Sequence, residues 1–86
     1  MQPESVKALV EAGLPGCEVF ASGDGSHFDV TVISEVFAGK TPVNRQRMVY
    51  ATVNEQITSG TLHAINIKTY TPEEWERARK LQMGPQ

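Results

Sequence analysis

The order of apolar and polar residues changes its period several times along the chain, and each period predicts one element. Residues 3–12 carry Val6, Leu9 and Val10 at intervals of three and one, the i, i+3, i+4 spacing of an amphipathic helix. Pro3 suits the first turn of such a helix, and the glycine and proline residues that follow it end it. The chain therefore opens with a predicted helix.

Two short strands joined by a turn are predicted next. Residues 17–21 form the first strand, and residues 22–26 are a serine-, glycine- and aspartate-rich cluster that cannot continue it. Residues 27–34 alternate between apolar and polar side chains, as a half-buried strand does. The pair is expected to form an antiparallel hairpin, with one face of its second strand made by Phe28, Val30 and Val32.

A long helix is predicted in the middle of the chain. Residues 35–40 indicate a short helical turn, and the longer helix is expected from about Pro42 to Ile57, with Thr41 as its cap. Apolar residues recur every fourth position along it, at Val49, Val53 and Ile57.

The last third of the chain predicts one strand and one helix. Residues 62–68 form the third strand. Thr71, Pro72 and Glu74 make a capping box that starts a helix, which is expected to end near Leu81.

The predicted order is therefore helix, strand, strand, helix, strand, helix. A helix between the second and third strands permits a right-handed parallel crossover, so a mixed three-stranded sheet with helices packed on one face is expected. This is an α/β chain of the α+β type, with a single domain over residues 1–86 and a disordered tail at residues 82–86.

Composition limits the classes of function. A chain of 86 residues buries only a thin core, so its function is expected on an outer face or in a site that a partner completes. The single cysteine excludes an internal disulfide and an all-cysteine metal site, and it suits a reducing compartment. With no signal peptide and no apolar run of about 20 residues, a soluble cytoplasmic protein without membrane contact is expected.

His63 is the most informative single residue. On a strand over residues 62–68, its side chain would share a face with Ile65 and Ile67. One interpretation is a histidine at the edge of the core that holds a backbone carbonyl, which spacing alone favours. The other is a neutral imidazole that offers a nitrogen to a metal, with further ligands supplied from elsewhere.

His27 and Cys17 are the other candidate ligands. His27 follows the predicted turn and lies on the polar face of its strand beside Asp29, so a surface histidine is its simpler interpretation. Cys17 occupies a plausibly buried position on the first strand, where a free cysteine is usually a small hydrophobe.

Four basic residues form a candidate nucleic-acid surface. No acidic residue lies between Glu35 and Glu55, although the chain has a formal net charge of −2. The alternative is a solvated helix face, and a few cations support only weak, salt-sensitive binding to phosphates. The candidates are Lys40, Arg45, Arg47 and Lys68.

Catalytic machinery is not recognisable. No serine, histidine and aspartate relay and no cysteine and histidine relay can be assembled from the spacing. Residues 22–26 lack the lysine and the following helix of a phosphate-binding loop. A binding domain is therefore expected in preference to an enzyme.

Five separated segments carry a pattern that covers nearly the whole chain. They are Ser-Gly-Asp-Gly-Ser-His-Phe at 22–28, Phe-Ala-Gly-Lys at 37–40, Arg-Gln-Arg-Met-Val-Tyr at 45–50, Leu-His-Ala at 62–64 and Tyr-Thr-Pro-Glu-Glu-Trp at 70–75. In this order and spacing they resemble the BolA-like family, and in particular its short bacterial IbaG branch. The resemblance implies a fold similar to class II KH domains, with the α-β-β-α-β-α order.

The resemblance also implies a cluster-binding adaptor. Members of the family partner monothiol glutaredoxins with a Cys-Gly-Phe-Ser motif, and each pair shares a 2Fe–2S cluster together with glutathione. The implied roles are cluster trafficking, iron homeostasis and stress responses, and the protein alone is expected to be a monomer or a weak homodimer. His63 matches the family's histidine ligand, and His27 is the leading match for the second ligand, ahead of Cys17.

A DNA-binding transcription regulator is the alternative that the resemblance implies. Some family members are described in this way, with contacts from the region that matches the second helix. Here Arg-Gln-Arg at 45–47 replaces the family's Arg-His-Arg, and residues 37–40 hold one glycine instead of the Gly-x-x-Gly of KH domains. These two differences weaken the case for nucleic-acid binding by analogy with KH domains.

Overall fold

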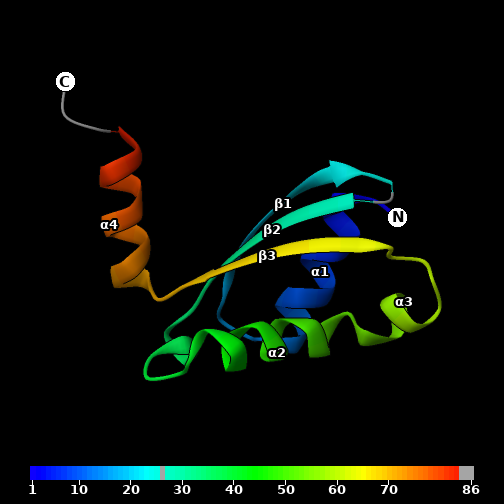
Figure 1. The fold of residues 1–86 in the computed structure, drawn as a ribbon, viewed down its shortest axis with the longest axis horizontal. Coiled ribbons are helices and arrows are strands. Elements are labelled where there is room, and N and C mark those ends of the chain that lie inside the picture. The colour runs from blue at the N-terminus through cyan, green and yellow to red at the C-terminus, as the bar shows by residue number, and fades with distance from the viewer. Residues whose placement is uncertain (26, 84–86) are drawn as a thin grey trace.

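The computed structural model describes residues 1–25 and 27–83, in which helices lie against one face of a three-stranded sheet and the last helix stands beyond one end of it (Figure 1). The predicted order of elements is confirmed, with one extra break in the middle helix. The tail was expected to be disordered from residue 82, but the last helix continues to Met83. Residues 84–86, the rest of that tail, lie outside the described residues. The elements are α1 (Pro3–Gly13), β1 (Glu18–Asp24), β2 (His27–Ile33), the 3-10 turn η1 (Glu35–Phe37), α2 (Pro42–Thr52), α3 (Asn54–Thr58), β3 (Ala64–Tyr70) and α4 (Pro72–Met83).

The sheet has the order β1-β2-β3 and is mixed, as predicted. β1 and β2 are antiparallel, and β2 and β3 are parallel, because α2 and α3 carry the chain back between them. The register pairs Asp24 with His27 across the hairpin and His27 with Ala64 across the parallel ladder. One end of the sheet is therefore defined by the hairpin turn and by the start of β3.

The predicted bounds of the first and third strands, 17–21 and 62–68, were wrong, because β1 spans Glu18–Asp24 and β3 spans Ala64–Tyr70. β1 continues through Ser22 to Asp24, because these residues pair with the first three residues of β2. β3 begins at Ala64 and not at residue 62, because Ala64 already pairs with the first residue of β2. His63 therefore precedes the strand and does not belong to it.

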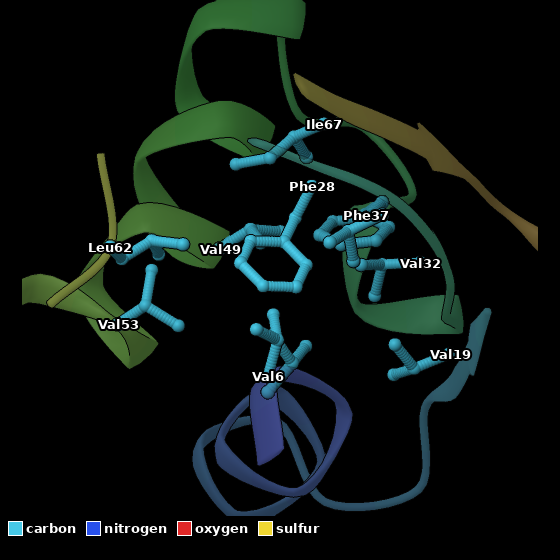
Figure 2. Packing of buried hydrophobic residues seen from close by; sticks show 11 residues of the cluster. Val6, Val19, Phe28, Val32, Phe37, Val49, Val53, Leu62 and Ile67 are labelled. Carbon is cyan, nitrogen blue, oxygen red and sulfur yellow. The ribbon is translucent and has the colours of Figure 1, made fainter. Parts of the chain in front are cut away.

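Phe28 lies at the centre of the core, between the sheet and the two helices that cover one face of it (Figure 2). Alternation along β2 directs Phe28, Val30 and Val32 to that face, and each is almost fully buried. α1 and α2 close the core from the other side. The helical and loop residues that complete it are Val6, Val10, Phe37, Val49, Val53 and Leu62.

The predicted helix from Pro42 to Ile57 is interrupted at Val53, whose φ of −121° and ψ of 16° are not helical. The hydroxyl of Thr52 donates to the Val49 carbonyl at 2.7 Å, and the Val53 N–H donates to Tyr50, so the chain tightens there. Val49 and Val53 are buried as the periodicity predicted. Ile57 is exposed, because the break turns α3 away from the core.

α4 differs from the other helices in its position. It stands beyond one end of the sheet (Figure 1), and its Trp75 stacks on Phe20 with ring centroids 5.7 Å apart. Phe20 neighbours the buried Val19 on β1 and so lies on the opposite, outer face of the sheet. α1 and α2 cover one face as expected, whereas α4 contributes to the other.

Gly23 holds the hairpin next to His27. Its φ is +144°, and a Cβ there would overlap the His27 carbonyl oxygen and approach Phe28 Cα to 2.8 Å. Gly23→Ala is expected to lower the free energy of unfolding by about 2 kcal/mol or more, measured by denaturant titration. Gly25→Asn is the control, because a side chain at Gly25 meets open space and asparagine accepts its φ of +43°. Equal stability of the two variants would contradict this account of the turn.

None of the helices in the described part of the chain is long and apolar enough to cross a membrane.

Candidate functional site

His63 lies exposed on the short connection between α3 and β3. The preceding residue, Leu62, is 1% exposed, and its N–H donates to the Gln56 carbonyl at 3.0 Å, so the connection is anchored immediately before the histidine. Within residues 1–25 and 27–83, the His63 ring makes no hydrogen bond or ion pair. The interpretation as a core-edge histidine bound to a backbone carbonyl is therefore wrong. The anchored backbone thus presents an imidazole that has no hydrogen-bond partner among the described residues.

His27 lies at the same end of the sheet. It is the first residue of β2, it is exposed, and it pairs with Ala64, the residue that follows His63. The parallel register thus places at one end of the sheet two histidines that are 36 positions apart in the sequence. Among the described residues, no group of three or more metal-ligating side chains is found. The chain can offer one or two imidazoles and needs further ligands from another molecule.

Cys17 is separated from the two histidines. It precedes β1, and the β1 residue Glu18 pairs with Ile33 at the far end of the hairpin from His27. Six residue steps of about 3.3 Å put roughly 20 Å between these ends. Burial raises the pKa of the Cys17 thiol, and its Sγ lies 4.0 Å from the Val10 carbonyl oxygen. Cys17 packs as a small hydrophobe and cannot bind the same metal centre as His63 of its own chain.

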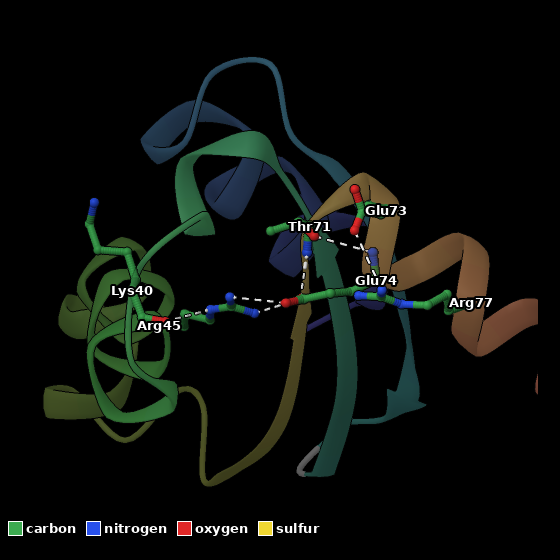
Figure 3. Close-up of polar contacts among 6 residues, drawn as sticks. All are labelled: Lys40, Arg45, Thr71, Glu73, Glu74 and Arg77. Atoms are coloured by element: carbon green, nitrogen blue, oxygen red, sulfur yellow. Dashed lines mark hydrogen bonds and ion pairs between the residues drawn. The ribbon is translucent and has the colours of Figure 1, made fainter.

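Arg45 bridges α2 and α4 (Figure 3). Its Nη1 lies 2.6 Å from Glu74 Oε1, its Nη2 donates to Oε2 at 3.2 Å, and its Nε donates to the Lys40 carbonyl at 3.1 Å. The guanidinium carbon also lies 6.0 Å from the centroid of the Phe37 ring. The three hydrogen bonds use the nitrogen atoms that would bind a phosphate, so Arg45 has a structural role in this state of the chain.

Glu74 combines two functions at the start of α4. Its carboxylate accepts from the Thr71 N–H at 2.9 Å, and its own N–H donates to Thr71 Oγ1, which completes the predicted capping box. The hydrogen bond from Arg45, followed by that from the Thr71 backbone, lowers the pKa of Glu74 from 4.5 to about 2. Glu74 is therefore ionised at any physiological pH and fixes α4 against α2.

Glu74→Gln is expected to reduce stability by about 1 kcal/mol above pH 5, because glutamine keeps the cap but loses the charge. The value is small since the Glu74 side chain is 34% exposed and solvent screens the pair. Because folding depresses this pKa, the stabilisation is complete above pH 4.5 and is lost as the pH falls toward 2. Thermal melting of the parent and of Glu74→Gln between pH 2.5 and 7 should show a difference in melting temperature that shrinks as the pH falls.

Glu73→Gln is the matched control for that series. Glu73 pairs with Arg77 at 3.4 Å, but the two side chains are 82% and 66% exposed. Its loss is expected to change the melting temperature very little at any pH. A difference for Glu74→Gln that is constant down to pH 2.5 would contradict the depressed pKa.

The four basic candidates do not all share one surface. Arg47 follows Arg45 by two positions, which is about 200° around α2, so the two side chains leave the helix on nearly opposite sides. Lys68 neighbours the buried Ile67 and therefore lies on the outer face, across the sheet from α2. Between the arginines, Gln46 donates to the Ile67 carbonyl at 2.8 Å and ties α2 to β3. Lys40 and Arg47 are exposed.

Known proteins resemble the chain over nearly its whole length. Acid stress protein IbaG from Escherichia coli K12 is 42% identical over 81 residues, which cover 94% of this chain and 96% of that protein. The DNA-binding transcriptional regulator BolA from Vibrio cholerae is 41% identical over 76 residues, 88% of this chain and 68% of that protein. A bolA protein homologue from Coxiella burnetii has a solved structure with a TM-score of 0.82 and 38% identity, covering 90% of this chain and 99% of that one.

The family itself is recognised independently of these relatives. A sequence model described as BolA-like protein matches residues 4–74, from the first turn of α1 to the carboxylate that caps α4. The matched range contains the hairpin, both histidines and the whole sheet. The expected resemblance and the expected fold are confirmed, and the chain belongs to the BolA-like family.

Proposed function

We propose that this chain is an adaptor, not an enzyme, which binds a 2Fe–2S cluster jointly with a monothiol glutaredoxin and glutathione. His63 is the ligand on this side, and His27 is the candidate for a second. The observation that carries the proposal is the exposed His63 ring, which has no hydrogen-bond partner among the described residues. It lies on an anchored backbone at the end of the sheet where β2 begins with His27. Membership of the BolA-like family supports it.

The donor set fits one half of such a cluster. A 2Fe–2S cluster takes four protein or small-molecule ligands, and two imidazoles can replace two thiolates on one iron. The described residues supply no complete site, and Cys17 lies at the other end of the sheet. The remaining ligands in this proposal are the glutaredoxin cysteine and the glutathione thiol.

The cluster is the cargo of this adaptor. Neutral nitrogen ligands change its reduction potential and bind ferric iron less strongly than thiolates do, so the imidazole half is the side from which the cluster can be released. His63 binds and orients that half from the short connection before β3. Because the described residues form no closed metal site, loading depends on the partner in this proposal.

The test is a titration of a cluster-loaded monothiol glutaredoxin with this chain in the presence of glutathione. Visible absorption and circular dichroism are expected to change and to saturate at a fixed ratio of the two proteins. Cys17→Ser is the control and should give the same change, because its thiol is remote from His63. An unchanged spectrum at excess chain would overturn the proposal.

DNA binding is the second candidate, favoured by the 41% identity to the Vibrio cholerae regulator and by the exposed Lys40 and Arg47. Two phosphate contacts predict a slope of about −2 in a plot of log affinity against log salt concentration. Arg47→Ala should reduce that slope by about 1 in fluorescence anisotropy with duplex DNA. Binding that ignores salt, or that Arg47→Ala leaves intact, would exclude this surface.

A further inference from the structure

A groove of about 810 Å³ opens where η1 and α4 meet the beginning of β1. Its floor is apolar: Ile33 is buried there, whereas Phe20 and Val36 are 48% and 42% exposed. Trp75 forms one wall and stacks on Phe20, and the Tyr70 ring supports it from behind at a centroid distance of 5.3 Å. The groove therefore offers rigid aromatic surface to solvent.

The rim of this groove carries uncompensated negative charge. Glu18 from β1 and Glu35 from η1 are exposed and form no ion pair within the part of the chain that the structure describes. The third carboxylate, Glu76, is already paired with Arg79 at 2.8 Å. The groove thus has two unpaired carboxylates beside the exposed Phe20 ring and the half-buried Trp75 ring, which is the combination that attracts a cation next to an apolar group.

We propose that this groove binds a short segment of a partner protein in which lysine or arginine flanks an aromatic or large aliphatic residue. The apolar residue packs on Phe20 and Trp75, and the cation lies between Glu18 and Glu35. Charge complementarity determines this choice of occupant, because an acidic or neutral segment would leave both carboxylates without a partner.

The groove is remote from the histidines. It lies at the end of the hairpin where Glu18 pairs with Ile33, six residue steps or roughly 20 Å from the pair of His27 and Ala64. A segment bound here leaves His63 accessible. The chain can therefore contact two different proteins at once, and the inference does not depend on the cluster.

The test begins with selection of 12-residue peptides from a random phage-displayed library on the full chain. Enriched peptides are synthesised and titrated into the protein, with the fluorescence of Trp75, the only tryptophan, as the signal. The enriched sequences are expected to carry net positive charge with aromatic or aliphatic residues, and to shift the Trp75 emission. Raising the salt concentration should weaken their binding.

Charge reversal identifies the site. Glu18→Lys with Glu35→Lys is expected to weaken peptide binding at least about tenfold at low salt. Glu4→Lys with Glu55→Lys, a double reversal of the same total charge at exposed positions on α1 and α3, should have no such effect. Phe20→Ser tests the apolar floor separately, in case the charge reversal impairs folding, and should also weaken binding.

Four results would overturn the proposal. They are a library without enrichment, enriched peptides that lack cations, binding that neither the charge reversal nor Phe20→Ser weakens, and Trp75 emission that changes with the concentration of the chain alone. The last result would show that a second copy of the chain occupies the groove.

Discussion

Phe28→Ala is expected to remove most of the stability of this domain. The ring is 2% exposed and lies at the centre of the core between the sheet, α1 and α2 (Figure 2). Truncation of a buried phenylalanine costs about 3–5 kcal/mol, and a domain of this size has little more than that to lose. Denaturant and thermal unfolding followed by circular dichroism measure the loss.

Phe20→Ala is the matched control for that prediction. The same residue type is 48% exposed on the outer face of the same sheet, where it contacts Trp75. Its truncation should cost about 1 kcal/mol, because about half of the side chain stays exposed to water. If Phe28→Ala were no more harmful than Phe20→Ala, the assignment of the core face would be wrong.

His63→Ala is expected to abolish the spectral change with cluster-loaded glutaredoxin while the protein stays as stable as the parent. The side chain is exposed and makes no hydrogen bond to a described residue, so its loss should change the free energy of unfolding by less than about 0.5 kcal/mol. Loss of a residue that only orients a metal ligand already weakens metal sites by about 10–100-fold, and loss of the ligand itself should exceed that.

His27→Asn and His63→Cys complete this experiment. If His27 is the second ligand, His27→Asn should weaken the shared complex without eliminating it, because His63 remains. His63→Cys should restore cluster binding with a changed spectrum, since a thiolate also binds iron. A full spectral change with His63→Ala would contradict the assignment of this residue.

Local sequence rules predicted most of the fold. The capping box of Thr71 and Glu74 and the cap at Thr41 are formed as expected, because these interactions span only three residues. The alternation of Phe28, Val30 and Val32 identified the core face of β2. These features depend on residues that are close in the sequence, and local spacing is sufficient for them.

Features that depend on long-range pairing were not predictable. The start of β3 depends on its register with His27, and a strand drawn from residue 62 placed His63 on the wrong side of that boundary. The sequence predicted Arg45 on a phosphate-binding surface. Its ion pair with Glu74 could not be predicted, because the two residues are 29 positions apart. The break at Val53 is local, with hydrogen bonds from Thr52 and Val53 to residues three positions earlier, but the apolar periodicity of the helix does not reveal it.

The candidate site could be predicted only in part. The family pattern pointed to His63, and the structure adds that its ring is exposed and that the register brings His27 to the same end of the sheet. The same register separates Cys17 from both. The spacing in the sequence could not predict this distance in space, because Cys17 and His27 are only ten positions apart along the chain.

The most direct test of the central claim is pulsed electron paramagnetic resonance of the reduced shared cluster, with only this chain labelled with nitrogen-15 histidine. The account predicts a hyperfine coupling to histidine nitrogen that is present in the parent complex and changed or lost in the His63→Cys complex. A cluster bound by both proteins without any such coupling would show that His63 is not an iron ligand.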